Sequence, residues 1–153
     1  MVYHINSLVP EFWCSDFDES LLFYTEVLGF SVGQRRGDDH HAYIERGDAQ
    51  LMIARWEQDE AWEPGSLEKP YGRGVNFQIL VEDVRALYEA VLAAGVEPFV
   101  TLETKSYWRT DRMDVRTQFA IVDPDGYLLR FSQVDASSEI EQSDLDELDI
   151  KYA

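Results

Sequence analysis

One order of short elements occurs twice along the chain, and this repeat limits the possible folds more than any other feature of the sequence. In each half, a short apolar strand pattern precedes a helix pattern, and three more strand patterns follow. Asp16 and Asp83 mark the helix starts, because aspartate is a favoured N-cap, and Gly29 and Gly95 mark the helix ends. Since neither half has enough core to be stable alone, the repeat predicts an α+β fold of paired βαβββ modules that form a concave cup.

The expected strands are alternating or β-branched stretches that lie between turn residues. In the first half they cover residues 6–14, 30–35, 41–46 and 50–56. In the second half they cover residues 74–81, 98–102, 117–122 and 127–133. Asp123-Pro124-Asp125-Gly126 predicts a tight turn between the last two strands.

This pattern divides the chain into four segments. They are a first module (residues 1–58), a linker (59–72), a second module (73–134) and an acidic C-terminal tail (135–153). The stretch from Lys105 to Arg116 is polar and charged and lies between two expected strands. We interpret it as a loop whose Tyr107 and Trp108 close over the cup, because loops of this length in compact domains are usually functional.

Acidic residues far outnumber basic ones, with 30 Asp and Glu against 13 Lys and Arg and a formal charge of −17. Such a chain is repelled by nucleic acid and by anionic membrane surfaces, so neither is expected as a partner. The charge favours a cationic ligand or serves solubility alone, and the sequence leaves both readings open. Cys14 is the only cysteine, which excludes a disulfide within the chain. With no signal-peptide pattern and no apolar run near the ~20 residues of a membrane span, a cytoplasmic protein is expected.

Two motifs in the correct order resemble a known superfamily. Ser-Asp-Phe-Asp-Glu-Ser-Leu-Leu-Phe-Tyr-Thr-Glu-Val-Leu-Gly-Phe at residues 15–30 is similar to the first helix of the vicinal oxygen chelate proteins. Val-Asp-Pro-Asp-Gly-Tyr-Leu-Leu-Arg-Phe at residues 122–131 is similar to their closing hairpin. The resemblance covers about residues 5–134. The superfamily holds glyoxalases, extradiol dioxygenases, fosfomycin-resistance enzymes and bleomycin-resistance proteins, so the resemblance implies the paired βαβββ fold without choosing an activity.

Enzymes of this superfamily bind a divalent metal through four inward strand positions. Counting from the two motifs places these positions at Val9, Met52, Asn76 and Arg130. Valine has no donor atom, methionine and a neutral amide are poor ligands, and arginine stays protonated and repels a cation. We therefore predict no metal, no cofactor and no catalytic residue.

The remaining possible metal ligands do not form a metal site, and only Glu11 among them is a candidate for the cup. Glu11 has the inward parity of the first strand, where it either pairs with Arg130 or contacts a cationic ligand. His40 and His41 are neighbours, so they point to opposite faces of a strand, and we interpret them as surface residues at a hairpin tip. Cys14 has no nearby histidine in the sequence and is expected to be inert.

Within the superfamily, the chain most resembles the bleomycin-resistance proteins. The similar segments are the closing motif that ends at Arg130, the helix start Asp16-Phe17-Asp18 and the turn Arg46-Gly47-Asp48. The resemblance implies a homodimer in which modules of the two subunits pair with each other. It also implies that the protein sequesters a drug stoichiometrically and does not turn it over. A cationic aromatic antibiotic in an acidic groove fits this reading.

Strand parity and the resemblance together give the candidate ligand-binding residues. They are Glu11, Trp13, Met52, Trp56, Asn76, Gln78, Tyr107, Trp108 and Arg130. Ordinary core packing is an equal alternative for Trp13. Two other functions stay open, namely a metal-dependent enzyme of glyoxalase or dioxygenase type and a binding member of the superfamily with an unrelated ligand.

Overall fold

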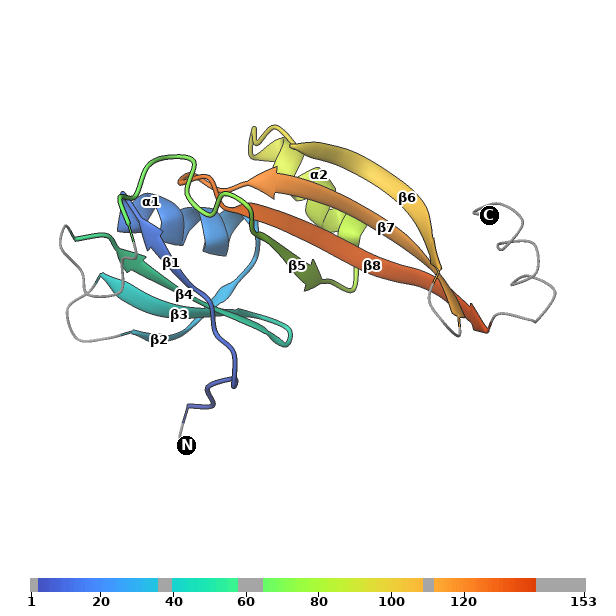
Figure 1. The fold of residues 1–153 in the computed structure, drawn as a ribbon, viewed down its shortest axis with the longest axis horizontal. Helices are drawn as coiled ribbons and strands as arrows, with labels where there is room; N and C mark the ends of the chain where they lie inside the picture. Colours follow the sequence, from blue (N-terminus) through green and yellow to red (C-terminus); the bar gives the residue numbers. More distant parts are fainter. Residues whose placement is uncertain (1–2, 36–39, 58–64, 109–111, 140–153) are drawn as a thin grey trace.

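Two four-stranded mixed sheets form the fold, and each carries one helix (Figure 1). The computed structural model describes residues 3–35, 40–57, 65–108 and 112–139. The first sheet has the order β1-β4-β3-β2, formed by β1 (Glu11–Cys14), β2 (Ser31–Arg35), β3 (His41–Arg46) and β4 (Ala49–Arg55). The second has the order β5-β8-β7-β6, formed by β5 (Asn76–Leu80), β6 (Val100–Trp108), β7 (Arg112–Val122) and β8 (Leu128–Glu139). In both sheets the first strand pairs in parallel with the last, which confirms the repeated βαβββ order.

Aspartate caps start both helices, as predicted. The Asp16 carboxylate accepts the backbone N–H of Glu19 at 3.0 Å, and the Asp83 carboxylate accepts that of Ala86 at 2.9 Å. Each bond satisfies an amide that the first turn of a helix leaves without a partner. The helices that follow are α1 (Phe17–Leu22) and α2 (Val84–Ala93).

The first helix departs from its expected regular course after Leu22. A π-helical turn, η1 (Phe23–Val27), replaces the last part of the predicted stripe before Gly29. The Leu28 amide donates to the Phe23 carbonyl, five residues back, and the Thr25 hydroxyl donates to the Leu21 carbonyl at 2.9 Å. A threonine hydroxyl that takes a carbonyl of the preceding turn competes with the helical ladder and bends it.

The two modules share one hydrophobic core on the helix side of the sheets. Phe12 of β1 stacks on Tyr127 with ring centroids 4.3 Å apart and lies 4.6 Å from the Phe77 ring of β5. Phe131 and Phe119 of the second sheet stack at 5.4 Å, and Tyr88 of α2 packs edge-on against Phe119. Because these rings join both halves in one cluster, neither module buries its apolar face by itself.

The turn between β7 and β8 connects the modules through two buried carboxylates. Asp125 accepts the backbone N–H and the hydroxyl of Ser15, at 3.0 and 2.7 Å, and its carboxylate lies 2.8 Å from the Lys69 ammonium. Asp123 accepts three backbone N–H groups of its own turn and the Tyr24 hydroxyl. Burial raises the pKa of the Asp123 carboxyl, although these hydrogen bonds oppose that effect. The predicted turn is therefore also the contact through which the second module holds α1.

Several predicted boundaries were wrong. β6 continues to Trp108 and β7 begins at Arg112, so the described residues of the expected 105–116 loop form a long hairpin. β8 continues through residues 135–139, which were assigned to the tail, because Glu139 pairs with Arg112 at the far end of β7. The rest of the expected tail, residues 140–153, lies outside the described residues.

The first strand also starts later than predicted, and one residue of the expected linker is buried. β1 begins only at Glu11, so Val9 precedes the strand. Tyr71, expected in the linker, is buried, and its amide donates to the Asp125 carbonyl at 2.8 Å. In the described part of the chain, no helix combines the length and apolar character that a membrane crossing requires.

Candidate functional site

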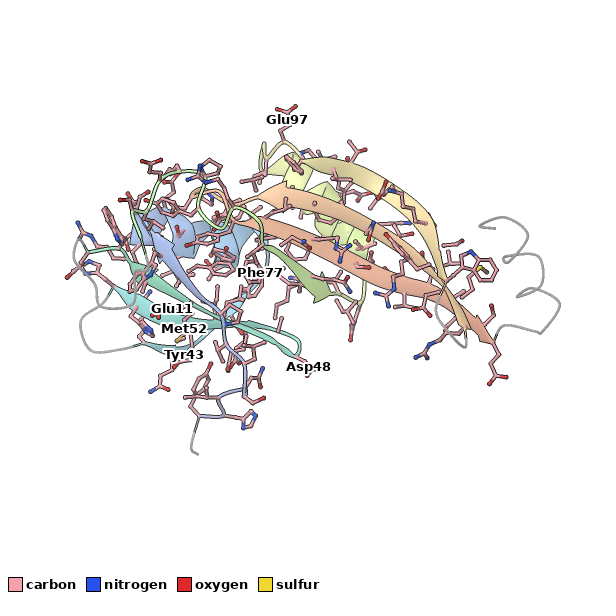
Figure 2. The ribbon with its side chains drawn as sticks, in the orientation of Figure 1. Glu11, Tyr43, Asp48, Met52, Phe77 and Glu97 are labelled. Atoms are coloured by element: carbon pink, nitrogen blue, oxygen red, sulfur yellow. The ribbon has the colours of Figure 1, made fainter. Side chains whose placement is uncertain are left out.

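Each sheet has a second face that its helix does not cover, and most of the predicted ligand-binding residues lie there. On the first sheet, Glu11 is opposite Met52, and Met52 is opposite Tyr43, so these side chains form one row across three strands. Figure 2 shows the three labelled residues together on this sheet. The next row holds Trp13, Ala54 and His41. Strand parity thus placed Glu11, Trp13 and Met52 on a common face.

His41 was wrongly predicted to be a surface residue. It begins β3 and is only 5% exposed, beside the Tyr43 ring at 5.5 Å. Its Nε2 lies 3.5 Å from the Glu11 carboxylate, and Arg130 is bonded to Gln78, so of the two alternatives for Glu11 the pairing with Arg130 is not formed in this structure. The signal that could have located His41 is its alternation with Tyr43 and Glu45, which puts all three on the same face.

The segment before β1 covers the far end of this first face. The Gln50 side chain accepts the Asn6 amide at 2.8 Å and donates to the His4 carbonyl and to Glu45. Tyr3 donates its hydroxyl to the Glu45 carboxylate, and partial burial together with that carboxylate raises the pKa of Tyr3 to about 12. A cleft of about 580 Å³ opens between this segment and the β3–β4 turn. No sequence motif pointed to this arrangement.

The second sheet holds a pocket of about 270 Å³ on its uncovered face. It joins four predicted residues, Gln78, Tyr107, Trp108 and Arg130, with two that the sequence reading missed. The missed residues are Arg116 and Gln118 of β7, which the register places on the same face as Arg130, at neighbouring positions. The long β6–β7 hairpin supplies four of the six residues, so the pocket depends on a strand pairing that had been interpreted as a loop.

Hydrogen bonds connect most of the polar groups in this pocket. Arg130 Nη2 donates to the Gln78 side-chain oxygen on the neighbouring strand. The Gln118 amide donates to the Tyr107 hydroxyl at 2.7 Å and to the Glu103 carboxylate at 2.9 Å. These bonds hold Arg130 of β8 against β5 and Gln118 of β7 against β6, so two pairs of strands position side chains of the pocket without a ligand.

Asn76 and Trp56, two further predicted ligand-binding residues, do not line this pocket. Asn76 begins β5 on the same face as Gln78, and it is exposed beside Leu128. Trp56 follows the end of β4, where its backbone amide donates to the Cys14 carbonyl at 2.9 Å. Their roles as ligand-binding residues stay predictions.

Cys14 lies on the helix side of β1 and not in the pocket. Its side chain is 2% exposed, and burial raises the pKa of the thiol to about 12. A thiol that stays protonated at neutral pH is a poor nucleophile. The structure therefore agrees with the reading of Cys14 as inert core.

The residues at the expected metal positions do not suit a divalent cation. Met52 is opposite Glu11, and Arg130 is opposite Gln78, which puts one carboxylate on the first sheet and a guanidinium on the second. Among the described residues, no group of three or more His, Cys, Asp or Glu side chains is arranged to hold a metal ion. A catalytic metal site requires at least three such protein ligands in one place, with water or substrate as a further ligand.

Comparison with known proteins gives a family and a set of similar folds. The sequence model of the Glyoxalase/Bleomycin resistance protein/Dioxygenase superfamily matches residues 4–131. A search of curated proteins finds no significant match. A structure of a superfamily member from Vibrio splendidus 12B01 is 36% identical in sequence, covers 86% of this chain and 97% of its own, and has a TM-score of 0.38.

Two further structures are similar in fold at lower identity. TioX from Micromonospora sp. ML1 has a TM-score of 0.61 and 22% identity, over 87% of this chain and 99% of its own. A glyoxalase/bleomycin resistance protein/dioxygenase from Alicyclobacillus acidocaldarius has a TM-score of 0.56 and 20% identity, over 86% and 93%. At these identities the likeness concerns the fold alone.

Proposed function

The chain belongs to the Glyoxalase/Bleomycin resistance protein/Dioxygenase superfamily, and within it we propose that it is a metal-free small-molecule binding protein of the bleomycin-resistance type. The observation that carries the proposal is the position of the Arg130 side chain. Its guanidinium stands at a position where the enzymes of the superfamily place a metal ligand, and it is hydrogen-bonded to Gln78 of the neighbouring strand. A permanent cation in this place opposes a divalent metal and favours recognition of an organic ligand.

The ligand that the sequence favours is an aromatic antibiotic with cationic groups. Its aromatic part would stack on exposed rings such as Trp108, which is 47% exposed beside the pocket. Its cationic part would lie on the first sheet, where Glu11 and Glu45 share one face. Sequestration needs no reacting group, which is consistent with the inert Cys14.

A homodimer is part of this proposal, as the resemblance to bleomycin-resistance proteins implies. The uncovered face of the second sheet exposes large apolar side chains, namely Leu80 (58%), Val134 (43%), Val100 (36%) and Val122 (36%). Pairing with the first-sheet face of a second copy would remove these groups from water and close a cleft over the pocket.

Calorimetric titration of the chelator-treated protein with bleomycin tests the function. We expect saturation near one drug per chain, with affinity that falls at raised salt because opposite charges are screened. Glu11→Gln should weaken binding several-fold, whereas Glu89→Gln, an exposed acidic residue of α2, should leave it unchanged. Absence of heat from a folded protein would contradict the named drug.

The alternative of a metal-dependent enzyme has one observation in its favour, the Glu11–His41 pair at 3.5 Å. A third ligand of the usual kinds is missing beside it in the described residues. Elemental analysis of the protein purified without chelator distinguishes the two functions. A stoichiometric divalent metal that Glu11→Gln removes would overturn the metal-free proposal.

A further inference from the structure

The pocket on the second sheet has a local charge opposite to that of the whole chain. The chain carries a formal charge of −17. The six residues that line the pocket nevertheless include two arginines, Arg116 and Arg130, and no carboxylate. Since acidic residues are more than twice as frequent as basic ones in the sequence, this lining points to a ligand other than a simple cation.

Of the cationic side chains around the pocket, Arg130 has no ion-pair partner among the described residues. Lys105 lies 2.8 Å from the Glu103 carboxylate, and Arg116 lies 3.0 Å from that of Asp114. Arg130 has the neutral Gln78 oxygen as its partner, and no carboxylate of the described residues lies within ion-pair distance of it. The nearby acidic groups are thus already neutralised by other residues, and the charge of Arg130 is available to a ligand.

Buried donors without partners support the same conclusion. Nε of Arg130 and Nε of Arg116 are both buried and lack a hydrogen-bond partner among the described residues. The Arg116 side chain is only 12% exposed. An N–H group that is removed from water without an acceptor costs about 1–3 kcal/mol, so two such groups in one pocket indicate acceptors that a bound ligand supplies.

The shape and aromatic wall of the pocket limit the ligand further. Trp108 is 47% exposed and lines the pocket together with Tyr107, whose hydroxyl accepts from Gln118 and keeps its own hydrogen to donate. The volume of about 270 Å³ lies just below the range of about 300–1,000 Å³ that is typical of small-molecule sites, so the ligand must be small. A guanidinium beside an indole suits a flat ring that carries an anionic group at its edge.

We propose that this pocket binds the carboxylate of a planar aromatic acid of one or two rings, with Arg130 as the main anion-binding residue and Trp108 as the stacking surface. The inference rests on the proposed function, because it names a ligand class for the pocket that holds Arg130. Arg116 and the Tyr107 hydroxyl contribute further donors around the carboxylate.

The test uses two probes of nearly the same shape, the anionic 2-naphthoate and the neutral 2-naphthamide, whose NH2 group replaces one carboxylate oxygen. We expect the full-length protein to bind naphthoate in a saturable manner near one per chain by calorimetry, with quenching of tryptophan emission. Naphthamide should bind at least tenfold more weakly, because it lacks the charge that Arg130 recognises. Equal affinity for the two probes would overturn the proposal, as would absence of naphthoate binding.

Variants of Arg130 separate a recognition role from a structural one. Arg130→Gln should reduce the affinity for naphthoate at least tenfold and leave that for naphthamide nearly unchanged. Arg130→Lys keeps the charge without the two-pronged geometry and should give an intermediate affinity. The matched control is Arg85→Gln, since Arg85 is exposed on α2 and lies outside the pocket. Unaltered naphthoate affinity in both Arg130 variants would contradict the role of this residue.

The naphthoate and bleomycin titrations test two different proposals, so either one can fail without the other. Naphthoate binding that depends on Arg130, without any bleomycin binding, supports the ligand class and overturns the named antibiotic. Bleomycin binding without naphthoate binding supports the proposed function and overturns the inference about this pocket.

Discussion

Tyr24 is the residue whose hydrogen bond most directly connects the first helix to the second module. Its side chain is fully buried, and its hydroxyl lies 2.8 Å from the Asp123 carboxylate. Burial and the neighbouring carboxylate hold the pKa of Tyr24 well above its usual value, so it stays a neutral donor. The bond therefore supplies one of the hydrogen bonds that compensate a carboxylate removed from water.

Tyr24→Phe removes this hydroxyl and little else. We expect a loss of about 1.5–3 kcal/mol in the free energy of unfolding, because the buried carboxylate loses a donor. Urea denaturation at neutral pH measures the change. Tyr43→Phe is the control, since Tyr43 is partly exposed and no hydrogen bond of its hydroxyl lies within the described residues, and it should change stability by less than about 0.5 kcal/mol. Similar losses in both variants would contradict the role of the hydrogen bond.

Single residues were predicted well where a motif fixed their position and poorly where strand pairing did. Arg130 and Gln78 were assigned to one face by counting and parity, and the register puts them side by side. Arg116 was missed because its strand was expected to start only at Thr117, which left it in a presumed loop. His41 was misjudged because one of its neighbours, Glu11, lies on another strand, and because its alternation with Tyr43 on its own strand was not used.

Helix α2 is the element whose start the sequence defined most clearly. Asp83 accepts the amide of Ala86, and the Gln133 side chain of β8 accepts the amide of Val84 at 3.0 Å. A local cap and a long-range cap therefore satisfy two amides of the same turn. This arrangement orients the helix on the sheet as well as stabilising it.

Asp83→Ala tests the local cap. The free energy of unfolding should fall by about 1 kcal/mol, a loss that Asp83→Ser should largely avoid because the serine hydroxyl also accepts the Ala86 amide. Thermal and urea unfolding of both variants give the comparison. An alanine variant as stable as the native chain would mean that Gln133 alone is a sufficient cap.

Among the elements, helices and turns were predicted from local signals, whereas the long β6–β7–β8 arm was not. Caps and glycines act within a few residues, so the sequence displays them directly. The arm is held by polar pairs between strands, such as Thr104 with Thr117 at 2.8 Å and Thr117 with Asp135 at 2.6 Å. Such pairs leave no alternation of apolar and polar residues to detect.

At the scale of the molecule, the proposal predicts that association of two chains depends on apolar side chains on the uncovered face of the second sheet. Sedimentation at micromolar concentration should give twice the mass of one chain. Leu80→Glu should shift the protein toward a single chain, because Leu80 is 58% exposed on the uncovered face. Leu92→Glu is the control, since Leu92 is similarly exposed, at 47%, but lies on α2. A single-chain mass for the native protein would overturn the dimer.

The contacts of Asp123 and Asp125 have a consequence for synthesis on the ribosome. Ser15 bonds to Asp125, which lies 110 residues later in the sequence, and Tyr24 bonds to Asp123, which lies 99 residues later. The first module therefore leaves the exit tunnel before these partners of its helix exist, and Phe12 lacks its stacking partner until Tyr127 has been synthesised. Since the two modules share one core, the apolar face of the first module stays exposed to water during synthesis until the second module has been made.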